Sequence, residues 1–159
     1  MDNLLTIILK DTFSLTQFKT RVRLLKSYFL KDIFGGETDS LQSPGQDVSW
    51  LKSLPSDFHQ KFNKDNIYDI FSELEQAAAK FPTLTMYLAF EPDDVTLSNL
   101  GTFARKTFGS SLMLDVKFDP NLIAGCALVW KGVYKDYSMR SKIEQGKAGI
   151  TEGFKKFLR

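Results

Sequence analysis

The chain has 159 residues, of which 43% are hydrophobic and 13% aromatic, enough to bury the core of one compact domain or two small ones. Its 21 basic and 19 acidic residues leave a net charge of only +2, so the strong basic excess typical of nucleic-acid-binding proteins is missing and any basic surface must be local. A single cysteine excludes an internal disulfide, and no motif has the spacing of metal ligands, which favours a reducing compartment.

The opening segment, MDNLLTIILK, does not predict a targeting signal. Its apolar core is too short for a secretory signal, and it lacks the arginine-rich character of a transit peptide. The longest apolar run, Leu122 to Trp130, is about half of the roughly 20 residues that a membrane-spanning helix needs. We therefore expect any association with a membrane to depend on a partner.

Residues up to Phe81 have the apolar spacing of helices, with steps of three and four. Ser14 and Gln17 form a capping-box pattern before the first long helix, and Gly35 with Gly36 favours a left-handed exit from it. The apolar stripe of this helix consists of Leu15, Phe18, Val22, Leu25, Phe29 and Ile33.

The segment GGETDSLQSPGQDVS predicts a mobile connection, because it is rich in Gly, Ser, Pro and acidic residues. Two short helical segments follow, around Trp50–Leu54 and Phe58–Phe62, with Pro55 between them. A longer helix ends before Pro82, and its apolar face consists of Ile67, Ile70, Phe71, Leu74, Ala78 and Phe81. We count four helices and predict an all-helical domain over residues 1–82.

A change of period at Leu84 marks a second domain, predicted over residues 83–159. LTMYLAF favours a strand, and EPDDVTLSNLGTFARKTFG favours a helix that begins near Asp93 and Asp94 and ends at Gly109. Apolar and polar residues alternate in LMLDVKF, which predicts a half-buried strand. Its buried face would carry Leu112, Leu114, Val116 and Phe118, with Met113, Asp115 and Lys117 on the other face.

A turn at residues 119–121 leads into the apolar run, which predicts a more fully buried strand from Leu122 to Trp130. Lys131 and Gly132 predict a tight hairpin into VYKDY. The expected fold is therefore α+β, with an N-terminal helical bundle, a small β-α-β-β-β unit and a C-terminal helix.

The last helix is predicted to begin after Ser138, a favourable N-cap residue. Each of its three glycines weakens it by about 1 kcal/mol relative to alanine, so we expect it to gain order against a partner. Its basic residues suit an acidic partner helix; they are Arg140, Lys142, Lys147, Lys155, Lys156 and Arg159. Apolar or small residues recur at steps of three and four and form what we call the seam, namely Met139, Ile143, Gly146, Ile150, Phe154 and Phe157.

The near end of the seam, Met139 to Ile143, is expected to pack in the core of the same chain, as apolar helical faces usually do. The glycine-rich far end is expected to be more available to a partner.

No catalytic, cofactor or metal site is expected. Cys126 lies in the apolar run, where burial raises the pKa of a thiol, and is interpreted as core. His59 has no evident nucleophile beside it and is interpreted as solvated or capping. Asp93 and Asp94 lie where a helix macrodipole favours acids, and no glycine-rich segment has the lysine of a phosphate loop.

Several short motifs follow one another between Leu84 and Ile143. They are Phe108-Gly109, Asp119-Pro120-Asn121-Leu122-Ile123-Ala124-Gly125, Asp136-Tyr137-Ser138, and Arg140 with Ile143. Their order resembles the C-terminal region of the delta subunit of F-type ATP synthases, whose mitochondrial counterpart is the oligomycin-sensitivity-conferring protein. Ala124 and Tyr137 replace glycines of the family pattern.

The resemblance implies a non-catalytic stator subunit without cofactor or small-molecule substrate, peripheral at the cytoplasmic face of the cell membrane. It implies two partners, the alpha subunit of the catalytic head for the helical domain and the b subunit for the C-terminal region. We assign the seam to the b-subunit contact as a hypothesis, and the helix with the Leu15-to-Ile33 stripe to the head-docking bundle.

Other interpretations remain open at the level of sequence. The E-type stalk subunit of vacuolar or archaeal ATPases has a similar C-terminal hairpin, but the loop after Gly35 interrupts the long charged helix that it would need. Tyr134 and Tyr137 beside Lys131 and Lys135 could bind single-stranded nucleic acid, against the near-neutral charge balance. An enzyme with Cys126 as nucleophile comes third.

Overall fold

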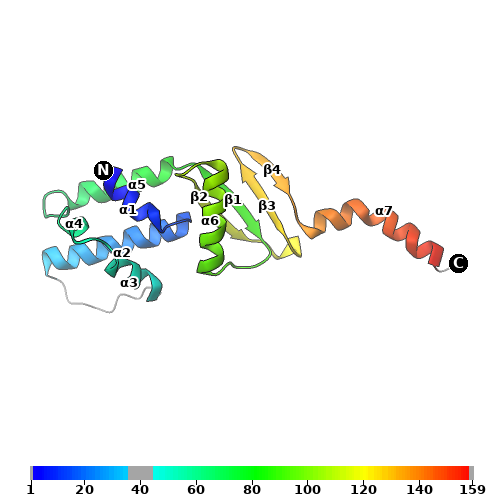
Figure 1. Cartoon of the computed structure of the whole chain (residues 1–159), viewed down its shortest axis with the longest axis horizontal. Helices are drawn as coiled ribbons and strands as arrows, with labels where there is room; N and C mark the ends of the chain where they lie inside the picture. The colour runs from blue at the N-terminus through cyan, green and yellow to red at the C-terminus, as the bar shows by residue number, and fades with distance from the viewer. Residues whose placement is uncertain (1, 36–44, 158–159) are drawn as a thin grey trace.

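The structure, a computed structural model, describes residues 2–35 and 45–157. Figure 1 shows the chain as three parts in a row, a bundle of helices, a small sheet with one helix on it, and a single projecting helix. Most of the predicted mobile connection, residues 36–44, lies outside the described residues. Its last residues, from Gly45, instead begin a helix.

The described part of the first 82 residues contains five helices rather than the predicted four. The second short helix ends at His59, before the predicted limit at Phe62. The long helix has both predicted caps: the Ser14 and Gln17 side chains complete the capping box, and Gly35 exits with a φ of 73°. The helices are α1 (Asp2–Lys10), α2 (Leu15–Phe34), α3 (Gly45–Lys52), α4 (Ser56–His59) and α5 (Ile67–Lys80).

Aromatic rings fill much of the helical core. Phe29 stacks on Phe62 with ring centroids 4.0 Å apart, and Phe62 stacks on Phe71 at 5.6 Å. Arg21 is buried beside this core, where its Nε donates to Asp47 at 3.3 Å and its guanidinium lies 4.6 Å from the centre of the Trp50 ring. These contacts attach α3 to α2.

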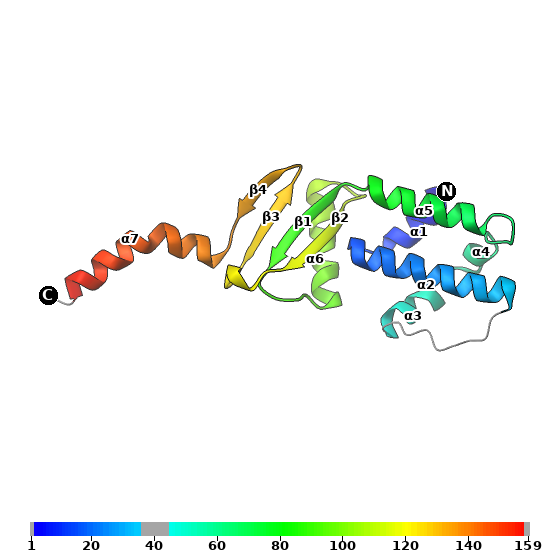
Figure 2. The ribbon, with the colours of Figure 1, turned by 180° about the vertical axis from the view of Figure 1, so that it is seen from behind.

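The second part is a four-stranded sheet in the order β2-β1-β3-β4. β1 and β2 are parallel and are joined through α6, whereas β3 pairs antiparallel with β1 and with β4. Figure 2 shows the face of the sheet opposite α6. The elements are β1 (Thr83–Leu88), α6 (Asp94–Phe108), β2 (Met113–Phe118), the 3-10 turn η1 (Pro120–Leu122), β3 (Cys126–Trp130), β4 (Val133–Asp136) and α7 (Met139–Phe157).

Three predictions about strand burial were wrong. Met113, assigned to the polar face of its strand, is fully buried because the helical bundle packs against that face. At the other end of β2, Phe118 is exposed although it was assigned to the buried face. The apolar run does not form a fully buried strand from Leu122, since the chain turns until Gly125 and only Ala127 of β3 is fully buried.

The bundle and the sheet are joined by buried apolar residues and by the half-buried Arg105. Met113 belongs to the helical core, and the Leu114 amide donates to the carbonyl of Phe13 at 2.8 Å. Arg105 of α6 donates to the carbonyls of Leu9 at 2.8 Å and Leu112 at 3.1 Å, and also to that of Thr12. The boundary at residue 82 stays a prediction, but the two parts share a tightly bonded contact.

Candidate functional site

The turn from β4 into α7 is held by Asp136 and Ser138. A carboxylate oxygen of Asp136 accepts from the Ser138 amide at 2.8 Å, and the buried Ser138 hydroxyl accepts from the Ser141 amide at 3.2 Å. Ser138 is therefore the N-cap of α7, as predicted. Hydrogen bonds from Ser138 hold the pKa of Asp136 below its usual value.

The second half of the site is the loop that precedes β3. Asp119 accepts from the amide of Asn121 at 3.0 Å and starts the 3-10 turn, whose last residue, Leu122, is buried. Ile123 then adopts a φ of 67° and ψ of −56°, and the Ala124 amide donates to the Leu122 carbonyl at 2.7 Å. This is a classic γ-turn, a strained conformation for a β-branched residue, and it leaves the Ile123 side chain 65% exposed.

The loop and the turn meet in what we call the corner, the contact between residues 119–126 and 136–140. The Met139 amide donates to the Ala124 carbonyl at 2.8 Å, and the Tyr137 amide donates to the Cys126 carbonyl at 2.9 Å. Gly125 has a φ of 88°, and a Cβ there would lie 2.7 Å from the Tyr137 carbonyl oxygen. The motifs that are separate in the sequence thus form one contact, which sets the direction of α7.

Tyr137 fits the corner although it replaces a family glycine. Among the described non-glycine residues, positive φ angles occur only at Ile123 and Lys131, so Tyr137 does not need the conformational freedom of glycine.

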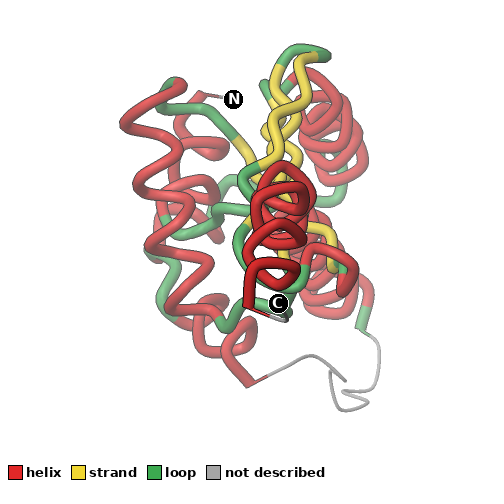
Figure 3. The backbone as a smooth tube through the Cα atoms, turned by 90° about the vertical axis from the view of Figure 1, so that its right-hand side faces the viewer, coloured by secondary structure: helices red, strands yellow, loops and turns green. Residues whose placement is uncertain are grey.

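From the corner, α7 projects away from the sheet (Figures 1 and 2), and in Figure 3 it points toward the viewer. Its main contact with the rest of the chain is with η1. The prediction that the near end of the seam lies in the core was wrong, because the corner directs α7 away from the sheet: Met139 and Ile143 are each 47% exposed.

The far end of the seam is more exposed still. Phe154 is 65% and Phe157 91% exposed, and nothing lies within 4 Å of a Cβ built on Gly153. Gly146 is also exposed, whereas the side chain of Ile150 lies outside the described residues. The described part of α7 therefore presents an apolar face that no other part of the described chain covers.

The polar side of α7 carries free positive charge. Arg140 donates to Glu144 at 3.0 Å, and this carboxylate, helped by Asp119 and Asp136, raises the Arg140 pKa. Within the described ranges, the lysines of the helix form no ion pair; they are Lys142, Lys147, Lys155 and Lys156. Arg159 lies outside the described residues.

The residues considered for catalysis do not come together. Cys126 is half-buried, and burial followed by the charge of Asp136 raises its thiol pKa, which makes the reactive thiolate scarce. His59 is half-buried at the end of α4 and packs near the rings of Tyr28, Phe29 and Phe58, at centroid distances of 5.5 to 6.1 Å. Asp93 caps α6 by accepting from the Thr96 amide at 2.8 Å, as its position predicts.

No metal-binding group is present in the described part of the chain, where no three His, Cys, Asp or Glu side chains cluster. The two tyrosines considered for stacking on nucleic-acid bases do not lie on one face of the hairpin. Val133, Lys135 and Tyr137 line a common cavity, whereas Tyr134 pairs with Val129 and lies on the opposite face of the hairpin.

Sequence reasoning missed Arg105 and Gly101, which join the two parts. Phe13 packs on Gly101, where a Cβ would lie 2.5 Å from the Phe13 side chain, and on the guanidinium of Arg105. An arginine in the last turn of a helix usually indicates only a favourable dipole contact, so no signal distinguished Arg105 from its neighbours.

Comparison with known proteins identifies the family. The model of the ATP synthase delta (OSCP) subunit family matches residues 62–149, more than half of the chain, and this range includes the sheet, the corner and the first half of α7. The chain belongs to this family. The family assignment favours the delta subunit over the E-type alternative.

Individual delta subunits match about half of the chain. ATP synthase subunit delta of Verminephrobacter eiseniae is 38% identical over 45% of this chain and 39% of its own length. That of an Acidovorax strain is 34% identical over 49% of each chain. The chain thus spans about half the length, or less, of these curated relatives. Among the described residues, no helix combines the length and the apolar character needed to cross a bilayer.

Proposed function

We propose that this protein is a non-catalytic subunit of the peripheral stalk of an F-type ATP synthase. In this role it links the catalytic head to the membrane-anchored b subunits, so that proton-driven rotation is coupled to ATP synthesis. The observation that carries the proposal is the projecting α7 with its uncovered seam, set by a corner built from the delta-family motifs. An exposed apolar helical face is a common docking surface for another helix.

The two ends of the molecule have different roles in this proposal. The seam binds the b subunit through its apolar residues, with the lysines of α7 facing acidic side chains of the partner. The helical bundle binds the alpha subunit of the head. A shallow groove between α2 and α5 supports this assignment, since Val22 and Ala78 lie within it and Lys19, Arg23 and Lys26 border it.

The proposed location is the cytoplasmic face of the cell membrane, with attachment through the b subunit rather than through a segment of this chain. The role needs neither a cofactor nor a substrate. In this role the protein only binds its partners, and these contacts must withstand the torque of rotation.

The test is binding to the b subunit of the same organism, prepared without its membrane-spanning segment. Phe154→Asp combined with Ile143→Asp places two charges in the seam, and we expect affinity to fall by more than about 100-fold, since charging two buried contacts costs several kcal/mol. Phe103→Asp is the matched control, because Phe103 is an equally exposed phenylalanine on α6.

A chain truncated after Ser138 should also lose binding. If the truncated chain or the seam variant bound the b subunit as well as the full chain does, the assignment of α7 would be wrong. If neither the full chain nor the Phe103 variant bound the b subunit at all, the stalk function itself would be rejected.

A further inference from the structure

The face of the sheet that α6 covers is apolar on β2, β1 and β3, whereas β4 contributes Val133 and Lys135 to it. Residues that alternate along the strands point to this face, including Leu84 and Leu114 near α6 and Leu128 and Trp130 on β3. α6 lies mainly over β1 and β2, and at its last residue Phe108 reaches Trp130 of β3. Over β3 and β4 the same face is hollowed into a cavity of about 370 Å³, which we call the hairpin groove.

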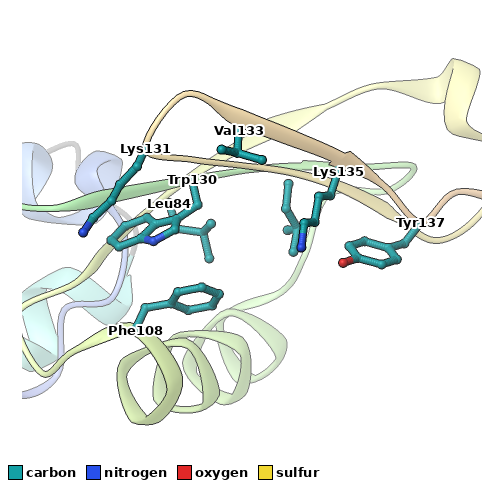
Figure 4. A pocket seen from close by; sticks show the side chains of 8 residues that line it. Leu84, Phe108, Trp130, Lys131, Val133, Lys135 and Tyr137 are labelled. Carbon is teal, nitrogen blue, oxygen red and sulfur yellow. The ribbon is translucent and has the colours of Figure 1, made fainter.

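The hairpin groove has an aromatic end, where Lys131 lies beside the rings, and a polar end (Figure 4). At the aromatic end the rings of Phe108 and Trp130 lie 5.2 Å apart. At the polar end the Lys135 ammonium group and the Tyr137 hydroxyl point into the groove. Val133 and Tyr137 are more than half exposed, so the groove is open to solvent along the hairpin.

The width of the uncovered surface matches one helix. Strands lie about 4.8 Å apart, and a helix with its side chains is about 10 Å wide, so one helix covers about two strands. Since α6 occupies the space over β1 and β2, the space over β3 and β4 accepts one further helix beside α6.

The helix α7 does not fill this space. At the corner, the amide of Met139, the first residue of α7, donates to the carbonyl of Ala124, and the helix then points away from the sheet. A second copy of α7 also fits poorly, because its lysines would approach Lys131 and Lys135 at the groove.

The charge at the groove selects an acidic occupant. Lys131 lies over the Trp130 ring at 5.5 Å, and within residues 2–35 and 45–157 neither Lys131 nor Lys135 forms an ion pair. No carboxylate lines the groove among the described residues. A helix with an apolar face and flanking Glu or Asp would cover the exposed rings and neutralise both lysines.

We propose that the hairpin groove binds an amphipathic helix with acidic flanks, supplied by a partner protein, and that this surface is separate from the seam of α7. This inference does not rest on the proposed stalk function, because it concerns a different surface and its test contains no ATP synthase subunit.

The test uses two fluorescein-labelled helical peptides with the same leucine face, one flanked by glutamates and the other by lysines. Binding of each peptide to the full chain is measured by fluorescence anisotropy, and the contacted amides are identified by NMR. We expect the glutamate peptide to bind at least about 10-fold more tightly, with shifts at the Trp130 indole and along β3 and β4.

Charge-reversal variants locate the effect. Lys131→Glu with Lys135→Glu should reverse the preference, so that the lysine peptide binds more tightly. Lys155→Glu with Lys156→Glu changes the net charge equally, but on α7, and should keep the preference for the glutamate peptide. Equal affinity for the two peptides, shifts confined to α7, or reversal by the α7 variant would each overturn the proposal.

Discussion

Replacing Arg105 with methionine tests whether one side chain joins the helical bundle to the sheet. Arg105 lies on α6, yet two of its hydrogen bonds reach the carbonyls of Leu9 in the last turn of α1 and of Thr12 in the α1–α2 connection. A third reaches Leu112, and the guanidinium lies 4.8 Å from the centre of the Phe13 ring. Partial burial of the guanidinium lowers its pKa, so its charge depends on these acceptors for solvation.

Methionine keeps most of the apolar stem of Arg105 but leaves all three carbonyls without this donor. At about 1 kcal/mol for each lost hydrogen bond, the free energy of unfolding should fall by about 3 kcal/mol. For a chain of this size, about 1 kcal/mol corresponds to about 2–4 °C, so Tm should fall by about 6–12 °C.

The assay is urea unfolding followed by circular dichroism, with thermal unfolding as a second measurement. Lys106→Met is the matched control, since Lys106 is the exposed neighbour on the same helix, and its effect should stay within about 0.5 kcal/mol. If Arg105→Met and Lys106→Met had the same stability, Arg105 would not join the two parts.

Three further predictions concern the corner and α7. Gly125→Ala should lower the free energy of unfolding by about 2 kcal/mol or more in urea titrations, because alanine is disfavoured at positive φ and its Cβ would meet the Tyr137 carbonyl. Gly153→Ala should raise the helicity of α7 in circular dichroism, since the site is open and alanine favours a helix by about 1 kcal/mol. The lowered pKa of Asp136 stabilises the fold above about pH 4, and this contribution is lost as pH falls through the lower folded pKa. Asp136→Asn should therefore be less stable than the wild type near neutral pH, with the difference in Tm shrinking in acid.

Local patterns predicted the helices well where the sequence carries its own start and stop signals. The capping box at Ser14 and the glycine at position 35 fix the ends of α2 through contacts within a few residues. The cap at Asp93 and the exit at Gly109 do the same for α6. The hairpin at Lys131 and Gly132 was equally predictable, because both residues adopt the positive φ angles that such a tight turn needs.

Burial was predicted poorly where it depends on distant contacts. Alternation in β2 indicated which residues share a face, but not that the helical bundle covers Met113 on the other face. Apolar content similarly suggested a long strand from Leu122, although the γ-turn at Ile123 and the positive φ of Gly125 delay β3 until Cys126. The seam was predicted by its spacing, but its exposure follows from the corner, which no single motif describes.

The arrangement of rigid and unsupported parts has a consequence for the proposed stalk. Partly buried hydrogen bonds of Arg105 join the bundle to the sheet, and backbone hydrogen bonds join the sheet to α7 at the corner. Beyond the corner, α7 is a single helix whose glycines weaken it, and little else in the described chain supports it. We therefore expect α7 to be the part of the described chain that bends most easily. A partner helix along the seam would stiffen that weak part, so torque resistance in this proposal is a property of the complex rather than of this chain alone.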